Sequence, residues 1–194
     1  MDETWLTSAL ASDDVGGEGV LPEWIRPLQP GARVIGTATT CSVAPGDNLG
    51  VRLALEQGPT TGPVLVVGGA AESPAAVLGG LVAEALSLAG FRAVVTDGLV
   101  RDSGEVAGLL KVWGRGVTPL AGAKNGPATT GEPVEVGGVR ISPGDLLICD
   151  GDGVVVWPAV AVAKLRARAR ERDVRDTARA AHLRRTGRLE PPVR

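Results

Sequence analysis

The chain has 194 residues, of which 44% are hydrophobic and 22% charged, and its formal net charge is −2 at pH 7. This length and hydrophobic content are enough to bury a full core, and the nearly balanced charge gives no overall attraction to nucleic acid. With no tyrosine and one phenylalanine, the chain also has too few aromatic side chains for base stacking, so we expect no nucleic-acid partner.

The sequence shows no signal for export or membrane insertion. No apolar run approaches the roughly 20 residues that a membrane span needs, and the first residues are acidic where a signal peptide would be basic. We therefore expect a cytoplasmic protein with no membrane partner. Cys41 and Cys149 lie far apart without a Cys-x-x-Cys pattern, which indicates two small core residues rather than a disulfide or a zinc site.

Three regions are expected along the chain. Residues 1–30 form an N-terminal extension, in which a helix over 4–11 is followed by an acidic, irregular stretch and several prolines. Residues 31–160 form the core domain, and residues 161–194 form a C-terminal helix with an Arg-rich tail.

The first half of the core alternates strands and helices. Asp47-Asn48 precede a run of apolar residues at helical spacing and supply its N-cap. The expected elements are a strand at 33–38, a polar turn at 39–46, a helix at 49–57 and a buried strand at 63–67.

The stretch from Gly79 to Asp102 carries the strongest indication of chemistry. A helix beginning at Gly79 or Gly80 leaves its first backbone N–H groups unpaired, and such an end binds carboxylates and phosphates. The apolar run 91–95 predicts a buried strand, and the pair Arg101-Asp102 follows it where the chain leaves the core. The start of the helix and the Arg101-Asp102 pair are therefore expected to bind the same anion.

The second half of the core has a different sequence pattern, with short apolar runs separated by turn residues. Gly-Gly, Pro-Gly-Asp and Asp-Gly-Asp-Gly sequences are typical of hairpin turns, and the turn at Asp150 lacks the spacing of a calcium loop. The expected elements are a helix at 105–110, a strand at 111–117, a loop at 120–132 carrying Lys124 and Asn125, and four short strands over 133–157.

A final helix is predicted over 159–180, as a solvated, salt-bridged helix rather than a nucleic-acid arm. The lone histidine, His182, lies in the tail beyond this helix and is expected to be a surface residue, and no P-loop, dinucleotide, zinc-protease or serine-hydrolase motif occurs. The apolar face is predicted at Val160, Ala163, Leu165 and Ala167.

Several blocks resemble the RraA-like family, which includes the class II pyruvate aldolases that act on 4-hydroxy-4-methyl-2-oxoglutarate. They are GTATT at Gly36, DN at Asp47, PVLVVGG at Pro63, GGLVAEAL at Gly79, VVTDGLVRD at Val94 and PVEVGGVRISPGDLLICDGDGVVVWP at Pro133. The resemblance implies an α/β fold with a layered β/β/α, swivelling-domain-like core and a C-terminal helix. It also implies a homo-oligomer, a trimer or a hexamer, with the active site at the subunit boundary.

The resemblance also implies roles for particular residues. The backbone amides of Gly79, Gly80, Leu81 and Val82 would hold the carboxylate of a pyruvate unit. Arg101 would bind the pyruvate oxygens, and Asp102 would hold a divalent Mg²⁺ or Mn²⁺ ion, largely through water. A planar guanidinium and a helix N-terminus are both suited to a carboxylate beside a ketone.

One position departs from the family pattern. Family enzymes usually carry an acid directly after the glycine equivalent to Gly79, where this chain has Gly80. Glu84, one turn later, is a candidate to reach back toward the gap, because helix side chains lean toward the N-terminus. Weaker candidates are Glu72, and Glu171 or Asp173 from a neighbouring subunit.

Two classes of function stay open. The first is a metal-dependent lyase that cleaves 4-hydroxy-2-oxo acids to pyruvate and also decarboxylates oxaloacetate, since both reactions pass through the pyruvate enolate. The second is a non-catalytic regulator that binds a partner such as an RNA-degradation enzyme. Arg101-Asp102 favours the first and Gly80 the second, and the pair also has a simpler reading as a surface ion pair after a strand.

Overall fold

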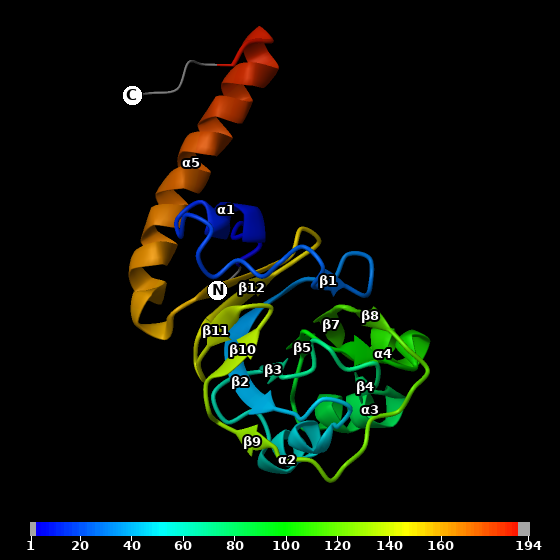
Figure 1. Cartoon of the computed structure of the whole chain (residues 1–194). Helices are drawn as coiled ribbons and strands as arrows, with labels where there is room; N and C mark the ends of the chain where they lie inside the picture. The colour runs from blue at the N-terminus through cyan, green and yellow to red at the C-terminus, as the bar shows by residue number, and fades with distance from the viewer. Residues whose placement is uncertain (1–2, 190–194) are drawn as a thin grey trace.

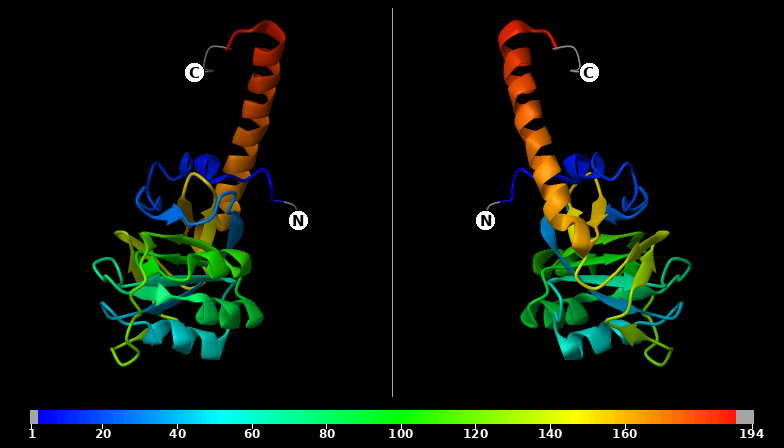
Figure 2. Two further views of the ribbon diagram at one scale, coloured as in Figure 1. Left: turned by 90° about the vertical axis from the view of Figure 1, so that its right-hand side faces the viewer. Right: turned by 90° about the vertical axis from the view of Figure 1, so that its left-hand side faces the viewer.

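The structure, a computed structural model that describes residues 3–189, is a mixed α/β body from which a long C-terminal helix projects (Figure 1, Figure 2). This fold class agrees with the expectation from the sequence. None of the helices within residues 3–189 combines the length and the hydropathy that a transmembrane segment needs.

The body is organised around an eight-stranded mixed sheet. Its strands are β1 (Arg26–Pro27), β2 (Val34–Ser42), β3 (Val64–Gly68), β5 (Ala93–Thr96), β7 (Lys111–Gly114), β9 (Thr129–Thr130), β12 (Leu146–Cys149) and β13 (Val154–Trp157). In space they follow the order β1-β7-β5-β3-β2-β12-β13, and β9 pairs with β2. Its centre is parallel and consists of β7, β5, β3 and β2. The other strands are each antiparallel to a neighbour: β1 to β7, β9 and β12 to β2, and β13 to β12.

Helices cover one face of this sheet. They are α2 (Leu49–Gln57), α3 (Gly80–Leu88) and α4 (Ser103–Leu109). Leu65 and Val67 of β3 belong to the same buried cluster as Leu86 of α3 and Val106 of α4. The continuous apolar sequence of β3 is explained by this arrangement, because a strand covered on both faces buries every side chain.

A β-hairpin covers the opposite face. It consists of β10 (Val134–Val136) and β11 (Val139–Ile141), which are antiparallel. Val64 and Val66, the alternate residues of β3, pack in one cluster with Val134 and Ile141 of the hairpin. The layers are therefore hairpin, sheet and helices, which is the β/β/α order expected from the sequence.

A second, small parallel sheet positions the residues of interest. It consists of β4 (Ala76–Leu78), β6 (Leu99–Val100) and β8 (Gly116–Val117). Leu78 and Val100, the last residues of β4 and β6, are paired with each other. The residues that follow the two strands, Gly79 and Arg101, therefore leave the sheet at the same edge.

The C-terminal helix is held by the N-terminal segment. The short helix α1 (Ser8–Ser12) packs beside the start of α5 (Val162–Thr186), which follows the 3₁₀ turn η1 (Ala159–Ala161). Leu165 and Ala169 of α5 are buried in a cluster with Leu6 and Trp157. Beyond this contact the helix projects away from the body (Figure 2).

The observed bounds correct several sequence expectations. The first core strand continues to Ser42, so its last residues pair with β3 and β9 instead of forming the predicted turn. The strand expected at 111–117 divides between two sheets, as β7 and β8. The predicted apolar face of the last helix was also wrong in part: Leu165 is buried, but Val160, Ala163 and Ala167 are exposed, and Ala169 is buried instead.

Candidate active site

The start of α3 and the Arg101-Asp102 pair lie side by side. The backbone N–H of Arg101 donates to the carbonyl of Leu78 at 2.9 Å, which joins the two chain segments just before they diverge. The backbone N–H of Gly80 donates to Oδ2 of Asp102 at 3.1 Å, and Nε of Arg101 lies 3.2 Å from the same oxygen. The side chains of Arg101 and Asp102 are 42% and 39% exposed, so a ligand can reach both.

Asp102 has an unusual backbone conformation. It is the one non-glycine residue within 3–189 with a positive φ, 53°, in the left-handed region. It occupies the N-cap position of α4, yet its side chain does not cap that helix and instead binds the start of α3. Left-handed backbone costs a non-glycine residue of order 1 kcal/mol, and such strain is characteristic of functional sites.

Gly79 leaves room for this arrangement. A Cβ atom added to Gly79 would lie 2.9 Å from both Nε of Arg101 and Oδ2 of Asp102, closer than side chains tolerate. Its φ of −137° is ordinary extended backbone, so space rather than conformation requires a glycine here. Any larger residue would displace the ion pair.

A carboxylate occupies the space beside Gly80, and it belongs to Glu105. A Cβ atom added to Gly80 would overlap Oε2 of Glu105 and would lie 3.1 Å from its Cδ. Glu105 is in the first turn of α4, three residues after Asp102, so the two side chains share one face of that helix. The space next to position 80, where the family pattern would place an acidic side chain, is thus occupied by a carboxylate from a different helix.

These groups line one cavity of about 340 Å³, which is large enough for a small organic acid. The N–H groups of Leu81 and Val82 belong to the first turn of α3 and have no partner within the helix. The lining includes Asn48, Gly79, Gly80, Leu81, Val82, Arg101, Asp102, Glu105 and Lys124.

Asp47 holds the other side of the cavity in place. Its Oδ2 accepts from the backbone N–H groups of Asn125 (2.8 Å) and Gly126 (2.9 Å), and its Oδ1 accepts from that of Leu49 (2.6 Å). Burial by itself would raise the pKa of Asp47, but these hydrogen bonds outweigh it and lower the pKa. The carboxylate thereby ties the 120–126 segment to the start of α2.

Two other acids considered from the sequence, Glu84 and Glu72, lie outside this cavity. Glu84 is an exposed residue of α3 and does not line the cavity, whereas Glu105 does. Glu72 lines a separate hollow together with Asp97, whose pKa is raised by burial.

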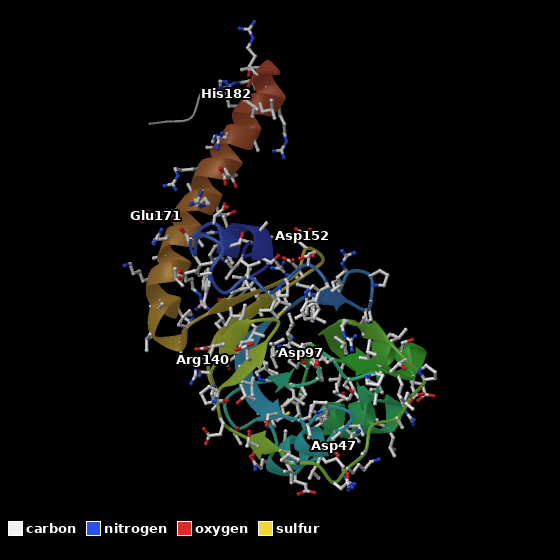
Figure 3. All side chains as sticks on the ribbon, viewed as in Figure 1. Asp47, Asp97, Arg140, Asp152, Glu171 and His182 are labelled. Carbon is white, nitrogen blue, oxygen red and sulfur yellow. The ribbon has the colours of Figure 1, made fainter. Side chains whose placement is uncertain are left out.

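Glu171 and Asp173, the candidates from a neighbouring subunit, belong to α5, where Asp173 pairs with Arg170 at 2.7 Å. Figure 3 shows Glu171 on this helix beside the N-terminal segment and His182 near its outer end.

Sequence reasoning missed Glu105 and Asn48. Glu105 could have been found from its spacing, because an acid three residues after Asp102 on a helix faces the same way. Asn48 was assigned to helix capping, a role that its side chain does not perform in the structure.

The acidic groups of the cavity suit a hard divalent cation bound through few protein ligands. Within residues 3–189, no cluster of three or more His, Cys, Asp or Glu side chains is arranged to bind a metal. Asp102 and Glu105 supply two carboxylates at the cavity. Mg²⁺ is commonly bound by one or two carboxylates and keeps several of its waters, so the residues present fit that ion.

A larger hollow, of about 690 Å³, lies between the N-terminal segment, the β10–β11 hairpin and α5. Two of its three acids, Asp14 and Asp145, are already engaged, and the third, Glu18, is an exposed residue. Asp14 pairs with Arg168 and Arg172, and Asp145 accepts from the backbone N–H groups of Ser142 and Ala159. The smaller cavity, in contrast, is lined by polar groups from several segments that a ligand can reach. We take it as the candidate active site.

Comparison with known proteins identifies the family. Residues 8–156 match the family model RraA-like, described as Aldolase/RraA. The chain belongs to the RraA-like family. A relative from Halalkalibacterium halodurans, named "Putative 4-hydroxy-4-methyl-2-oxoglutarate aldolase", is 36% identical over 172 residues, which cover 87% of this chain and 80% of the relative.

Solved structures share the fold, and one of them is named RraA. An uncharacterised protein from Pseudomonas syringae pv. tomato has a TM-score of 0.81 at 29% identity, covering 95% of this chain and 86% of its own. The RNA-processing inhibitor RraA from Thermus thermophilis has a TM-score of 0.70 at 31% identity, covering 81% and 94%. The family thus includes relatives with an aldolase name and relatives with a regulatory one.

Proposed function

We propose that this RraA-like protein is a divalent-metal-dependent lyase that cleaves 4-hydroxy-2-oxo acids, of the 4-hydroxy-4-methyl-2-oxoglutarate type, to pyruvate. The observation that carries the proposal is the carboxylate of Glu105 beside Gly80, in one cavity with Arg101 and Asp102. It supplies the acid that position 80 lacks. The aldolase name of the relative that is 36% identical supports the same activity.

The proposed roles follow from charge and geometry. The free N–H groups at the start of α3 and the guanidinium of Arg101 bind the carboxylate and the keto oxygen of the pyruvate half. In the cleavage, the C4 hydroxyl loses its proton to water, the C3–C4 bond breaks, and its electron pair forms the pyruvate enolate. The enolate then takes a proton from water at C3. Arg101 offsets the negative charge on the enolate oxygen.

Asp102 and Glu105 would hold Mg²⁺ or Mn²⁺, with water completing the coordination. When bound, the ion supplies Lewis-acid polarisation of the keto group. Gly80 and Arg101 hold the Asp102 carboxylate in one orientation through its Oδ2. Decarboxylation of oxaloacetate is proposed as a second reaction of the same site, because it also yields the pyruvate enolate.

The test of this function combines activity with binding. The wild-type protein with Mg²⁺ should release pyruvate from 4-hydroxy-4-methyl-2-oxoglutarate, followed with lactate dehydrogenase and NADH. Arg101→Lys keeps the positive charge but loses the planar fork, so oxalate, an enolate analogue, should bind at least about tenfold more weakly, or about 1.4 kcal/mol. Calorimetry measures this affinity. Equal oxalate affinity in the two proteins would remove Arg101 from the site.

We also propose that the protein assembles as a trimer or a hexamer. On α3, Leu81 is 81% exposed and Leu88 is 84% exposed, and Leu81 borders the cavity. Large exposed apolar side chains beside a site are typical of an interface. Light scattering at micromolar concentration should give three or six times the mass of one chain, 19.7 kDa. A monomer under these conditions would contradict the assembly.

The alternative function is a non-catalytic regulator that binds a partner protein such as an RNA-degradation enzyme. The 31% identical RNA-processing inhibitor from Thermus thermophilis favours it. The alternative predicts a protein that neither turns over the oxo acids nor binds oxalate. The assay above therefore separates the two functions.

A further inference from the structure

Asn48 stands at a position where asparagine normally caps a helix, but its side chain does not do so. It is the N-cap residue of α2, and no hydrogen bond joins its side chain to that helix. The first turn is satisfied instead by Oδ1 of Asp47, which accepts from the backbone N–H of Leu49. The side chain of Asn48 is therefore available for another purpose.

The amide oxygen of Asn48 is buried without a hydrogen-bond partner. The residue is 7% exposed, and its Oδ1 receives no hydrogen bond from any group of the described chain. Asn48 lines the same cavity as Arg101 and Glu105. Burial of an unpaired polar atom destabilises a fold, so such an atom at a cavity indicates a group that a ligand satisfies.

Lys124 adds a positive charge to the same part of the cavity. The backbone on both sides of Lys124 is held in place. The backbone N–H of Asn48 donates to the carbonyl of Ala123 at 2.9 Å, and the carboxylate of Asp47 accepts from the backbone N–H groups of Asn125 and Gly126. The ammonium group is on an exposed residue that lines the cavity. It can therefore neutralise a ligand carboxylate at the mouth of the site.

We propose that Asn48 and Lys124 form a subsite for the half of the substrate that leaves as the second product. Asn48 binds the C4 hydroxyl group and Lys124 binds the second carboxylate of a 4-hydroxy-2-oxo diacid. A hydroxyl suits Asn48 because in the bound substrate, before its proton passes to water in the cleavage, it donates to the unpaired oxygen, and a carboxylate suits the ammonium. This inference rests on the proposed lyase function, in which the start of α3 and Arg101 hold the pyruvate half.

The test compares substrates that differ at this end. For Asn48→Ala, kcat/KM should fall at least about tenfold more for 4-hydroxy-4-methyl-2-oxoglutarate than for oxaloacetate, which lacks the hydroxyl. The melting temperature should not fall, because the lost oxygen pairs with nothing in the fold. Asn125→Ala is the matched control, since Asn125 is exposed and does not line the cavity.

Lys124→Met tests the second contact. Its kcat/KM should fall at least about tenfold more for the diacid than for 4-hydroxy-2-oxopentanoate, which has no second carboxylate. Equal losses for both members of either substrate pair, or no losses, would overturn the subsite while leaving the lyase function in place. A wild-type protein that turns over none of these acids would overturn the lyase function and the subsite with it.

Discussion

Asp102→Asn should lower the lyase activity by about a hundredfold, equivalent to about 2.7 kcal/mol of transition-state stabilisation. The substitution removes the negative charge with little other change. Asparagine tolerates the left-handed backbone that Asp102 adopts at φ 53°, and its amide oxygen can still accept from the N–H of Gly80. Because the local fold is kept, the loss of activity would measure the contribution of the negative charge of Asp102.

The chelator experiment checks the same role independently. EDTA should abolish pyruvate release by the wild type, and Mg²⁺ or Mn²⁺ should restore it, whereas Asp102→Asn should recover little with added metal. Asp176→Asn serves as the control, because Asp176 pairs with Arg179 on the projecting part of α5. Wild-type activity that survives EDTA would contradict the metal-dependent mechanism.

Glu105→Ala should lower both Mg²⁺ affinity and pyruvate release, by about tenfold to a hundredfold. The reason is the position of Glu105, whose carboxylate occupies the space beside Gly80 and lines the cavity with Asp102. Because Mg²⁺ depends on few protein oxygens, the loss of one of two carboxylates is expected to be large. Mg²⁺ titration calorimetry and the coupled pyruvate assay measure the two quantities.

Glu84→Ala is the matched control for Glu105→Ala. Glu84 is also an exposed helix glutamate close to the site in sequence, but it does not line the cavity. Its removal should leave Mg²⁺ affinity and rate within about twofold of the wild type. A loss with Glu84→Ala as large as that with Glu105→Ala would show that the wrong carboxylate has been assigned.

Much of the fold could be predicted because its local signals agree with its packing. The buried strand β3 is continuously apolar, the helix α2 matches its predicted bounds, and the glycine pair marks the start of α3. The predicted bounds of strands were wrong where pairing with distant strands extends a strand or divides it between two sheets. Ser42 is in a strand because β3 and β9 pair beside it, and no local pattern around it indicates this.

The candidate site was also predicted only in part, because some of its residues are brought together by packing that local sequence signals do not show. The meeting of Gly79 with Arg101 was expected from the order of helix, turn and strand, but the two paired strands that bring these residues together, β4 and β6, were not predicted. The position of Glu105 depends on how α4 packs against α3, and a search along α3 alone finds Glu84 instead. The role of Asn48 depends on its neighbour Asp47 taking over the helix N-terminus, which only the hydrogen bonds of the structure reveal.

We propose that Glu105 supplies the carboxylate that position 80 lacks. Moving the acid between the two positions tests it most directly. Aspartate is compatible with the first turn of α3, where a negative charge is favourable. Its Cβ would occupy the space of the Glu105 carboxylate, so in the otherwise wild-type protein Gly80→Asp displaces one acid by another and should bring little gain.

The decisive measurement is therefore the Mg²⁺ affinity of the double variant Gly80→Asp/Glu105→Ala, compared with that of Glu105→Ala and of the wild type. Because the double variant has two carboxylates at the cavity again, it should recover most of the affinity and of the pyruvate release that Glu105→Ala loses. A folded double variant that binds Mg²⁺ no better than Glu105→Ala would show that Glu105 does not fill the role of an acid at position 80.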